Sequence, residues 1–162
     1  MLRVLLAFLL AAAVPACQRT VDTGPEAVRQ IIEVHNINAK RWYAAGHVDS
    51  LIALFAEDVW QLPPNSAPLV GRDSLRSFWA TAMTWGRWEF DFSTQDVVAS
   101  DSLAVERGRY TLKFTATSQA PIPSVADTGN YVVLWRQEPD GQWRAVWDAP
   151  VSTRPPAAPT NR

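Results

Sequence analysis

Apolar residues in the first half of the chain recur at helical spacing. Between residues 28 and 42 they fall every three or four positions, which is the pattern of one buried helix face. Gly46 follows this stripe and is a typical residue for a helix end. A shorter stripe over residues 48–55 predicts a second helix, and another that begins near residue 73 predicts a third. The first half is therefore expected to supply three amphipathic helices.

The second half changes to an alternation of apolar and polar residues, which is typical of half-buried strands. Pro139, Asp140 and Gly141 form a hairpin turn between two such segments. The expected strands cover residues 59–62, 88–93, 104–117, 131–138 and 143–150, and residues 119–128 are expected to form a loop. Helices followed by hairpin-connected strands indicate the α+β class. We therefore predict three N-terminal helices packed on a curved antiparallel sheet.

The first sixteen residues have the features of an export signal. Arg3 precedes an apolar run over residues 4–13, which is too short to cross a bilayer, since a spanning helix needs about 20 apolar residues. Small residues then lead to Cys17 in a pattern that resembles a bacterial lipobox, whose cysteine becomes the lipidated first residue of the mature chain. An ordinary signal-peptidase site fits the same residues, and either enzyme would cut before Cys17.

These features predict four segments along the chain. They are a signal peptide over 1–16, a tether over 17–25 that carries the lipidation site, a folded domain over 26–151 and a disordered proline-rich tail over 152–162. The expected location is a periplasm-facing membrane surface, reached through the lipid anchor only. In a Gram-negative cell this would be the outer membrane, because Gln18 rather than aspartate follows the cysteine.

Composition narrows the classes of function. The chain has 15 basic and 16 acidic residues and a formal net charge of −1, so it carries no positive surplus for binding nucleic acid. Its single cysteine excludes an intramolecular disulfide. The two histidines lie on different expected helices, and the sequence has no phosphate-binding or dinucleotide-binding loop motif. Neither a metal nor another cofactor is therefore expected.

Five segments, taken in order, resemble the nuclear transport factor 2-like superfamily, which includes the SnoaL-like proteins and the ketosteroid isomerases. They are residues 45–59, 71–75, 101–104, 129–135 and 140–143. The resemblance covers about residues 26–151 and implies a cystatin-like cone, in which the helices fill a curved sheet.

The resemblance does not imply isomerase chemistry. Pro63 stands at the position of the isomerase general base, Ala39 at that of the tyrosine that stabilises the oxyanion, and Val133 at that of the protonated aspartate. None of these three side chains can transfer or donate a proton, so the isomerase activity is not expected.

Three titratable residues are candidates for acid–base chemistry. His35 lies on the apolar stripe of the first expected helix, either as a pocket histidine that titrates near neutral pH or as an ordinary core histidine. Glu106 shares a strand face with apolar residues, where burial would raise its pKa unless it forms an ion pair with a nearby arginine or is exposed at the end of the strand. The alignment with the isomerase places the Asp148 side chain toward the pocket. Hydrophobicity instead favours an inward orientation of Trp143 and Trp147, which alternate with Asp148 along the strand. A bulge would reverse the register, so both orientations stay open.

Aromatic residues suggest a ligand pocket. All eight tryptophans lie between residues 42 and 147, inside the expected domain. Aromatic side chains bind apolar and planar molecules well, although they also fill ordinary cores. The candidate pocket residues are Asn38, Trp42, Trp60, Trp79, Trp88, Tyr131, Val133, Trp135 and Trp147.

The main expectation is an exported, lipid-anchored domain that binds a small apolar or aromatic molecule, with no assigned reaction. The first alternative is a cofactor-free lyase, isomerase or hydrolase that uses Glu106 or Asp148 with His35. The second is an interaction module that forms a homodimer through the uncovered face of its sheet.

Overall fold

The computed structural model describes residues 24–155, which fold into three helices and six strands. The helices are α1 (Pro25–Ala45), α2 (Val48–Ile52) and α3 (Arg72–Ala82). The strands are β1 (Phe55–Gln61), β2 (Leu69–Val70), β3 (Gly86–Ser100), β4 (Leu103–Ala116), β5 (Val125–Gln137) and β6 (Trp143–Ser152). The α+β class and the three helices predicted from the sequence are confirmed.

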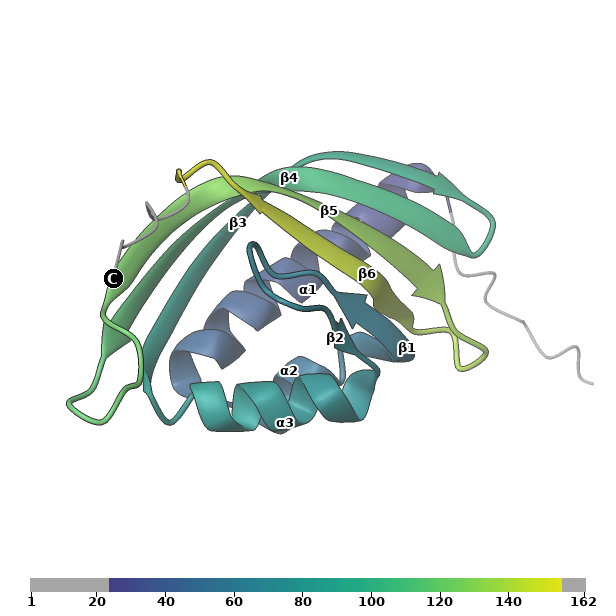
Figure 1. Ribbon diagram of the computed structural model, residues 1–162. Helices are drawn as coiled ribbons and strands as arrows, with labels where there is room; N and C mark the ends of the chain where they lie inside the picture. The colour runs from purple at the N-terminus through teal and green to yellow at the C-terminus, as the bar shows by residue number, and fades with distance from the viewer. Residues whose placement is uncertain (1–23, 156–162) are drawn as a thin grey trace, which may run out of the picture.

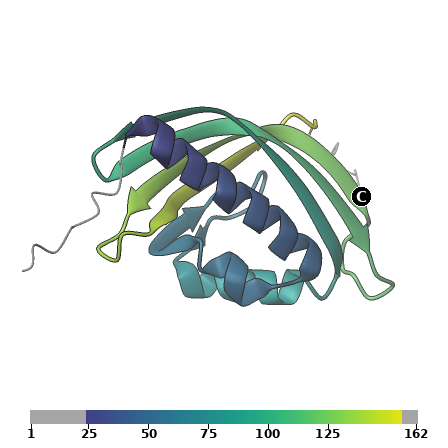
Figure 2. The same cartoon turned by 180° about the vertical axis from the view of Figure 1, so that it is seen from behind.

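The six strands form one curved sheet that arches over the helices (Figures 1 and 2). Helix α1 runs along the concave side and packs against β3, while α2 and α3 close the opening below. Strand β4 alternates buried and exposed residues along most of its length, as a strand with one covered face does. The hydrophobic core therefore lies between the concave face of the sheet and the helices.

One strand pair departs from the predicted antiparallel sheet. The strand order is β2-β1-β6-β5-β4-β3, and β1 pairs with β6 in parallel, whereas the other neighbours are antiparallel. Antiparallel pairs follow from hairpins, but β1 and β6 are far apart in sequence, so no hairpin sets their relative direction. The intervening α3 and strands β3 to β5 supply the long connection that a parallel pair needs.

Several element boundaries differ from the sequence prediction. Phe55 begins β1 rather than ending a helix, because α2 stops at Ile52. Strand β5 begins at Val125, inside the segment expected to be a loop. Ser152, expected to begin the tail, instead ends β6, and the Thr153 backbone N–H donates to the Thr128 carbonyl oxygen at 3.0 Å.

A bulge in β6 decides the orientation that alternation left open. Trp135 pairs with Ala145, but its neighbour Leu134 pairs with Trp147, so β6 carries one extra residue at this point. Beyond the bulge Trp147 points outward, while Asp148 lines the cavity on the concave side.

The export signal, the lipidation site at Cys17 and the end of the tail lie outside the described residues. Among residues 24–155, no helix is both long enough and apolar enough to span a membrane.

Candidate functional site

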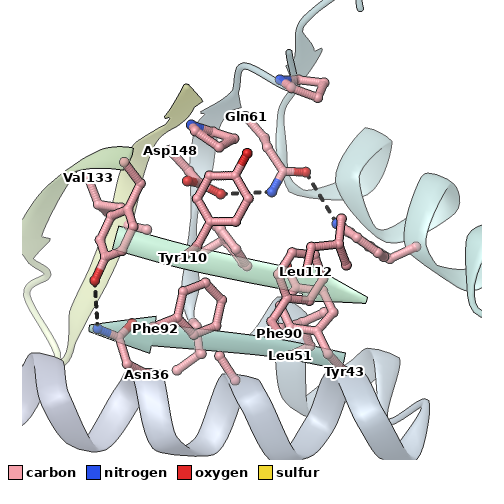
Figure 3. A pocket seen from close by; sticks show the side chains of 18 of the residues that line it. Asn36, Tyr43, Leu51, Gln61, Phe90, Phe92, Tyr110, Leu112, Val133 and Asp148 are labelled. Atoms are coloured by element: carbon pink, nitrogen blue, oxygen red, sulfur yellow. Dashed lines mark hydrogen bonds between the residues drawn. The ribbon is translucent and has the colours of Figure 1, made fainter. Parts of the chain in front are cut away.

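A cavity of about 260 Å³ lies between the concave face of the sheet and the helices (Figure 3). Its wall is mainly aromatic and aliphatic, with a few polar side chains. The aromatic lining residues are Tyr43, Phe55, Phe78, Trp79, Trp88, Phe90, Phe92, Tyr110, Tyr131 and Trp135, and the polar ones are Asn36, Gln61, Asp127 and Asp148. A mainly apolar cavity with few polar groups is typical of a small-molecule site.

Asp148 is held in this cavity by a chain of two hydrogen bonds. The Gln61 Nε2 donates to Asp148 Oδ2 at 2.8 Å, and the Trp79 Nε1 donates to Gln61 Oε1 at 3.2 Å. The indole therefore fixes the orientation of the Gln61 amide, and the amide in turn positions the carboxylate.

Burial raises the pKa of Asp148 to about 6, because the charged form loses hydration in the cavity. The hydrogen bond from Gln61 opposes this shift, and the negative charge of Glu106 adds to it. A carboxyl with a pKa near 6 exchanges its proton close to neutral pH, which suits a general acid or base.

The hydroxyl of Tyr43 remains protonated beside this carboxyl. Burial and the charge of Asp148 raise the pKa of Tyr43 well above its usual range, and a hydrogen bond with Gln61 opposes the shift. Tyr43 is thus a hydrogen-bonding group of the same wall rather than an acid.

Glu106 is fully buried but does not line the cavity. Its Oε1 accepts hydrogen bonds from Asn36 Nδ2, Thr94 Oγ1 and Tyr131 OH, each at 2.7 Å. Its Oε2 accepts one from Trp135 Nε1 at 3.1 Å. The carboxylate is therefore enclosed by protein donors, and three of these donors belong to residues of the cavity wall. Glu106 positions the wall and offers no free oxygen to a ligand, which argues against the catalytic role considered from the sequence.

Gly108 makes room for one of those donors. A Cβ at this position would lie 2.4 Å from the ring and hydroxyl of Tyr131, its partner across the strand pair. The absence of a side chain at Gly108 lets the end of the Tyr131 ring lie against β4, from where its hydroxyl reaches Glu106.

His35 lies outside the cavity. Its ring stacks on Trp135 with centroids 5.5 Å apart, and it hydrogen-bonds to the Trp143 backbone. Its Nε2 is buried without a hydrogen-bond partner in the described part of the chain, and burial lowers its pKa. The structure therefore does not bring His35 into the cavity with Asp148, contrary to the acid–base pair considered from the sequence.

Asp127 forms a second polar point on the cavity wall. Its Oδ2 accepts a hydrogen bond from Tyr110 OH at 2.8 Å, and its Oδ1 accepts one from Ser152 Oγ at 2.7 Å. Burial, with Asp127 beside it, raises the pKa of Tyr110 above its usual range. Both oxygens of Asp127 are thus engaged by the protein itself.

The candidate pocket residues divide into two groups. Trp79, Trp88, Tyr131, Val133 and Trp135 line the cavity. Asn38 and Trp42 lie on other faces of α1, and Trp60 and Trp147 lie on the outer face of the sheet, 46% and 56% exposed. For these four residues the pocket assignment is wrong, because the helix turns the first two away from the cavity and the strand alternation turns the other two outward.

Sequence reasoning missed five polar lining residues. These are Asn36, Tyr43, Gln61, Tyr110 and Asp127. Helical spacing carries a signal for two of them, because Asn36 and Tyr43 lie on the same face of α1 as Ala39. Alternation places Tyr110 on the buried face of β4. No local pattern marks Gln61 and Asp127, which reach the cavity from separate strands.

The three positions that correspond to the isomerase catalytic residues, Ala39, Pro63 and Val133, all line the cavity. None is titratable, but Asp148 is the direct partner of Val133 across the β5–β6 pair. The carboxyl of Asp148 therefore lies one strand away from Val133, the position that the resemblance assigns to the isomerase's protonated aspartate. Among residues 24–155, no three His, Cys, Asp or Glu side chains gather to hold a metal ion.

Fold and cavity together define a cone-shaped α+β domain with an internal small-molecule pocket. The sequence profile of the SnoaL-like domain matches residues 38–146, so the chain belongs to the SnoaL-like family of the nuclear transport factor 2-like superfamily. A comparison with curated protein sequences gives no match.

Solved structures with the same fold come from several bacteria. A conserved protein from Planctomyces limnophilus is 19% identical, with a TM-score of 0.70 over 78% of this chain and 98% of that one. A nuclear transport factor 2-like superfamily protein from Salmonella enterica is 13% identical, with a TM-score of 0.69 over 85% and 99%. A ketosteroid isomerase-like protein from Erwinia carotovora is 17% identical, with a TM-score of 0.66 over 78% and 96%. At these identities the similarity establishes the fold and not the reaction.

Proposed function

We propose that this chain binds a small molecule with a largely apolar or aromatic body in the cavity, with one polar group of that molecule at Asp148. The observation that carries the proposal is the cavity itself, about 260 Å³ with ten aromatic side chains in its wall. Each Å² of apolar ligand surface removed from water contributes about 25 cal/mol to binding. The aromatic faces add orientation, because stacked and edge-to-face contacts are directional.

Calorimetric titration with a naphthalene-sized neutral probe such as 1-naphthylmethanol tests this proposal. The wild-type protein should bind the probe saturably. Phe92→Ala removes a ring from the cavity wall and should weaken binding about tenfold, whereas Trp147→Ala on the outer face should leave it unchanged. No saturable binding, or equal losses in the two variants, would contradict the proposal.

A second candidate function is proton transfer catalysed by Asp148. The specific observation in its favour is a carboxyl that titrates near pH 6 inside an apolar cavity, fixed by Gln61 and Trp79. Such a group can remove a proton from a bound molecule and return it elsewhere, as cofactor-free lyases, isomerases and hydrolases require. His35 has no part in this version of the proposal.

Turnover of a panel of lactones, ketones and epoxides separates catalysis from binding. If Asp148 transfers the proton, Asp148→Asn should reduce turnover about 100-fold or more while ligand affinity changes little. If the wild type binds these compounds but converts none of them, the catalytic proposal is refuted and the binding proposal is retained.

Export and lipid anchoring remain part of the proposal on the strength of the N-terminal sequence. The apolar run ends at Ala16, and Cys17 is the only cysteine of the chain. Intact mass from a membrane fraction of the native host should show an acylated Cys17 at the mature N-terminus. Cys17→Ser should release the chain from the membrane, and a soluble wild-type protein with a free thiol would contradict the anchor.

We also propose self-association through the outer face of the sheet. Directly paired positions place Val70, Trp60, Trp147, Leu134, Val105 and Val98 in one apolar row across the six strands. An apolar row of this kind is buried when the same row of a second copy packs against it, which is the arrangement of a two-fold interface.

A further inference from the structure

The charged side chains that line the cavity are all negative. Asp127 and Asp148 are in the wall, and Glu106 lies directly behind it, bonded to Tyr131. In the part of the chain that the structure describes, no lysine, arginine or histidine lines the cavity. The only charged residue that shifts the pKa of Asp148 is Glu106, which is also negative. The site thus has a negative potential with no positive side chain to balance it.

Only one of the carboxylates has an oxygen to offer. Asp127 accepts a hydroxyl hydrogen bond on each oxygen, and Glu106 accepts four bonds from its surroundings. Asp148 accepts a bond from Gln61 on Oδ2, and no donor among residues 24–155 reaches its Oδ1. A half-buried carboxylate with a free oxygen in an apolar cavity is costly unless a proton or a positive charge accompanies it.

The aromatic rings of the wall would also attract a positive charge placed beside Asp148. Tyr43 packs against Trp79 and Phe90 at centroid distances of 4.7 and 4.4 Å, and Tyr43 interacts electrostatically with Asp148. Aromatic ring faces carry partial negative charge and attract cations, with a gain of about 2 kcal/mol when the cation is desolvated. Figure 3 shows Tyr43, Phe90, Tyr110 and Asp148 around the same hollow.

We propose that the ligand of this cavity is an organic cation: an amine or quaternary ammonium compound whose charge lies at Asp148 and whose apolar body lies among the rings. This inference rests on the proposed binding function and names the chemical class of its ligand. An anionic ligand would add a further negative charge beside these three carboxylates with nothing to neutralise it. A neutral alcohol could donate to Oδ1, but it would leave the charge of Asp148 unbalanced.

Three probes of the same shape and different charge test the inference. They are 1-naphthylmethylamine, 1-naphthylmethanol and 1-naphthoic acid, titrated calorimetrically into the full chain at pH 8, where the amine is cationic and Asp148 is ionised. The amine should bind about tenfold or more tightly than the alcohol, which corresponds to about 1.4 kcal/mol, and the acid should not bind measurably.

Asp148→Asn isolates the charge. The variant should lose most of the tenfold preference for the amine while its affinity for the alcohol changes less than about twofold. Asp91→Asn, which removes an exposed carboxylate that pairs with Lys40 outside the main cavity, is the matched control and should retain the full preference. Circular dichroism establishes that each variant is folded, and the wild-type comparison among the three probes stands without either variant.

The outcomes separate this inference from the proposed function. If the alcohol binds as tightly as the amine, or the acid binds best, the cavity is a binding site but not one for cations. If Asp148→Asn keeps the preference for the amine, Asp148 is not the group that recognises the charge. If none of the three probes binds, both the inference and the proposed binding function fail.

Discussion

Tryptophans lie on both sides of the sheet, but in different environments. On the concave side Trp79, Trp88 and Trp135 are nearly fully buried, and each donates its indole N–H to a protein acceptor. On the outer side Trp60 and Trp147 are about half exposed, and neither N–H donates to another of the described residues. A buried indole needs a hydrogen-bond partner, whereas an exposed one finds water.

This contrast shows that the polar side chains of the fold are arranged around the buried tryptophans on the concave side. The acceptors of the buried indoles are the Gln61 amide, the Ala82 carbonyl and the Glu106 carboxylate. Two of these acceptors also orient the side chains that a ligand would meet. The outer face has the apolar row without such a framework, so its residues should matter little for the stability of one chain and more for contact with another.

The largest expected effect is the loss of the buried carboxylate. Glu106→Ala removes the carboxylate that accepts four buried hydrogen bonds and opens a cavity, so the free energy of unfolding should fall by about 4 kcal/mol or more. Urea unfolding measures this. Asp96→Asn, which loses an exposed ion pair with Arg107, is the control and should change stability by about 0.5 kcal/mol or less. Equal losses of stability in Glu106→Ala and Asp96→Asn would contradict the view that polar groups on the concave side stabilise the fold more than those on the outer side.

The next effect compares two tryptophans directly. Trp79→Ala removes a ring that packs against Tyr43, Phe78 and Trp88 and frees the Gln61 amide, so stability should fall by about 3–4 kcal/mol. Trp147→Ala should cost the monomer about 0.5 kcal/mol or less, because more than half of the side chain is already exposed. Thermal unfolding at low protein concentration, where chains are apart, gives both values.

Asp148→Asn should stabilise the protein, and the gain should depend on pH. The pKa of Asp148 is about 6 in the folded chain and about 3.9 when unfolded, so ionisation favours the unfolded state as the pH rises from 4 through 6. Below about pH 3 the carboxyl is protonated in both states and costs nothing. The variant should therefore exceed the wild type by about 3 kcal/mol at pH 8 and match it near pH 3. A wild type that is equally stable at pH 8 would show that the carboxylate is compensated in the apo protein.

The smallest expected effect on stability tests the outer face. Trp147→Glu should leave the unfolding of one chain within about 0.5 kcal/mol of the wild type, since the side chain points into solvent. It should, however, abolish self-association, because a charge would lie in the middle of the apolar row. Sedimentation measures the change, and Arg109→Glu, an outward position away from the row, is the control. A wild type that is monomeric at high concentration would refute the proposed interface.

Local patterns were sufficient for most elements of the fold. The helical stripe and Gly46 predicted where α1 ends. Gly46 caps the helix in the left-handed conformation, with φ 70°. Alternation predicted β4 within a residue at either end. The start of β5 was missed because two of its inward positions are Asp127 and Gly129, so the first residues of this strand show no alternation of apolar and polar side chains. The parallel pairing of β1 and β6 has no local signal at all.

The site was less predictable, and Asp148 shows why. Simple alternation along β6 favours Trp147 for the interior, and only the bulge between Ala145 and Trp147 reverses this. A bulge depends on how two strands pair, which a single segment does not encode. The same holds for Gln61, which reaches Asp148 from a strand that is 87 residues away in the sequence.

The amino-acid sequence by itself determined the class of fold, the helices and most of the strands, because these depend on periodicity and on turn residues close together in the chain. The tertiary structure alone decided that Glu106 is enclosed by donors, that His35 lies outside the cavity, and that Asp148 faces it with one free oxygen. The physical reason is that the environment of a titratable group, and hence its charge and its role, is made by residues brought together from distant parts of the chain.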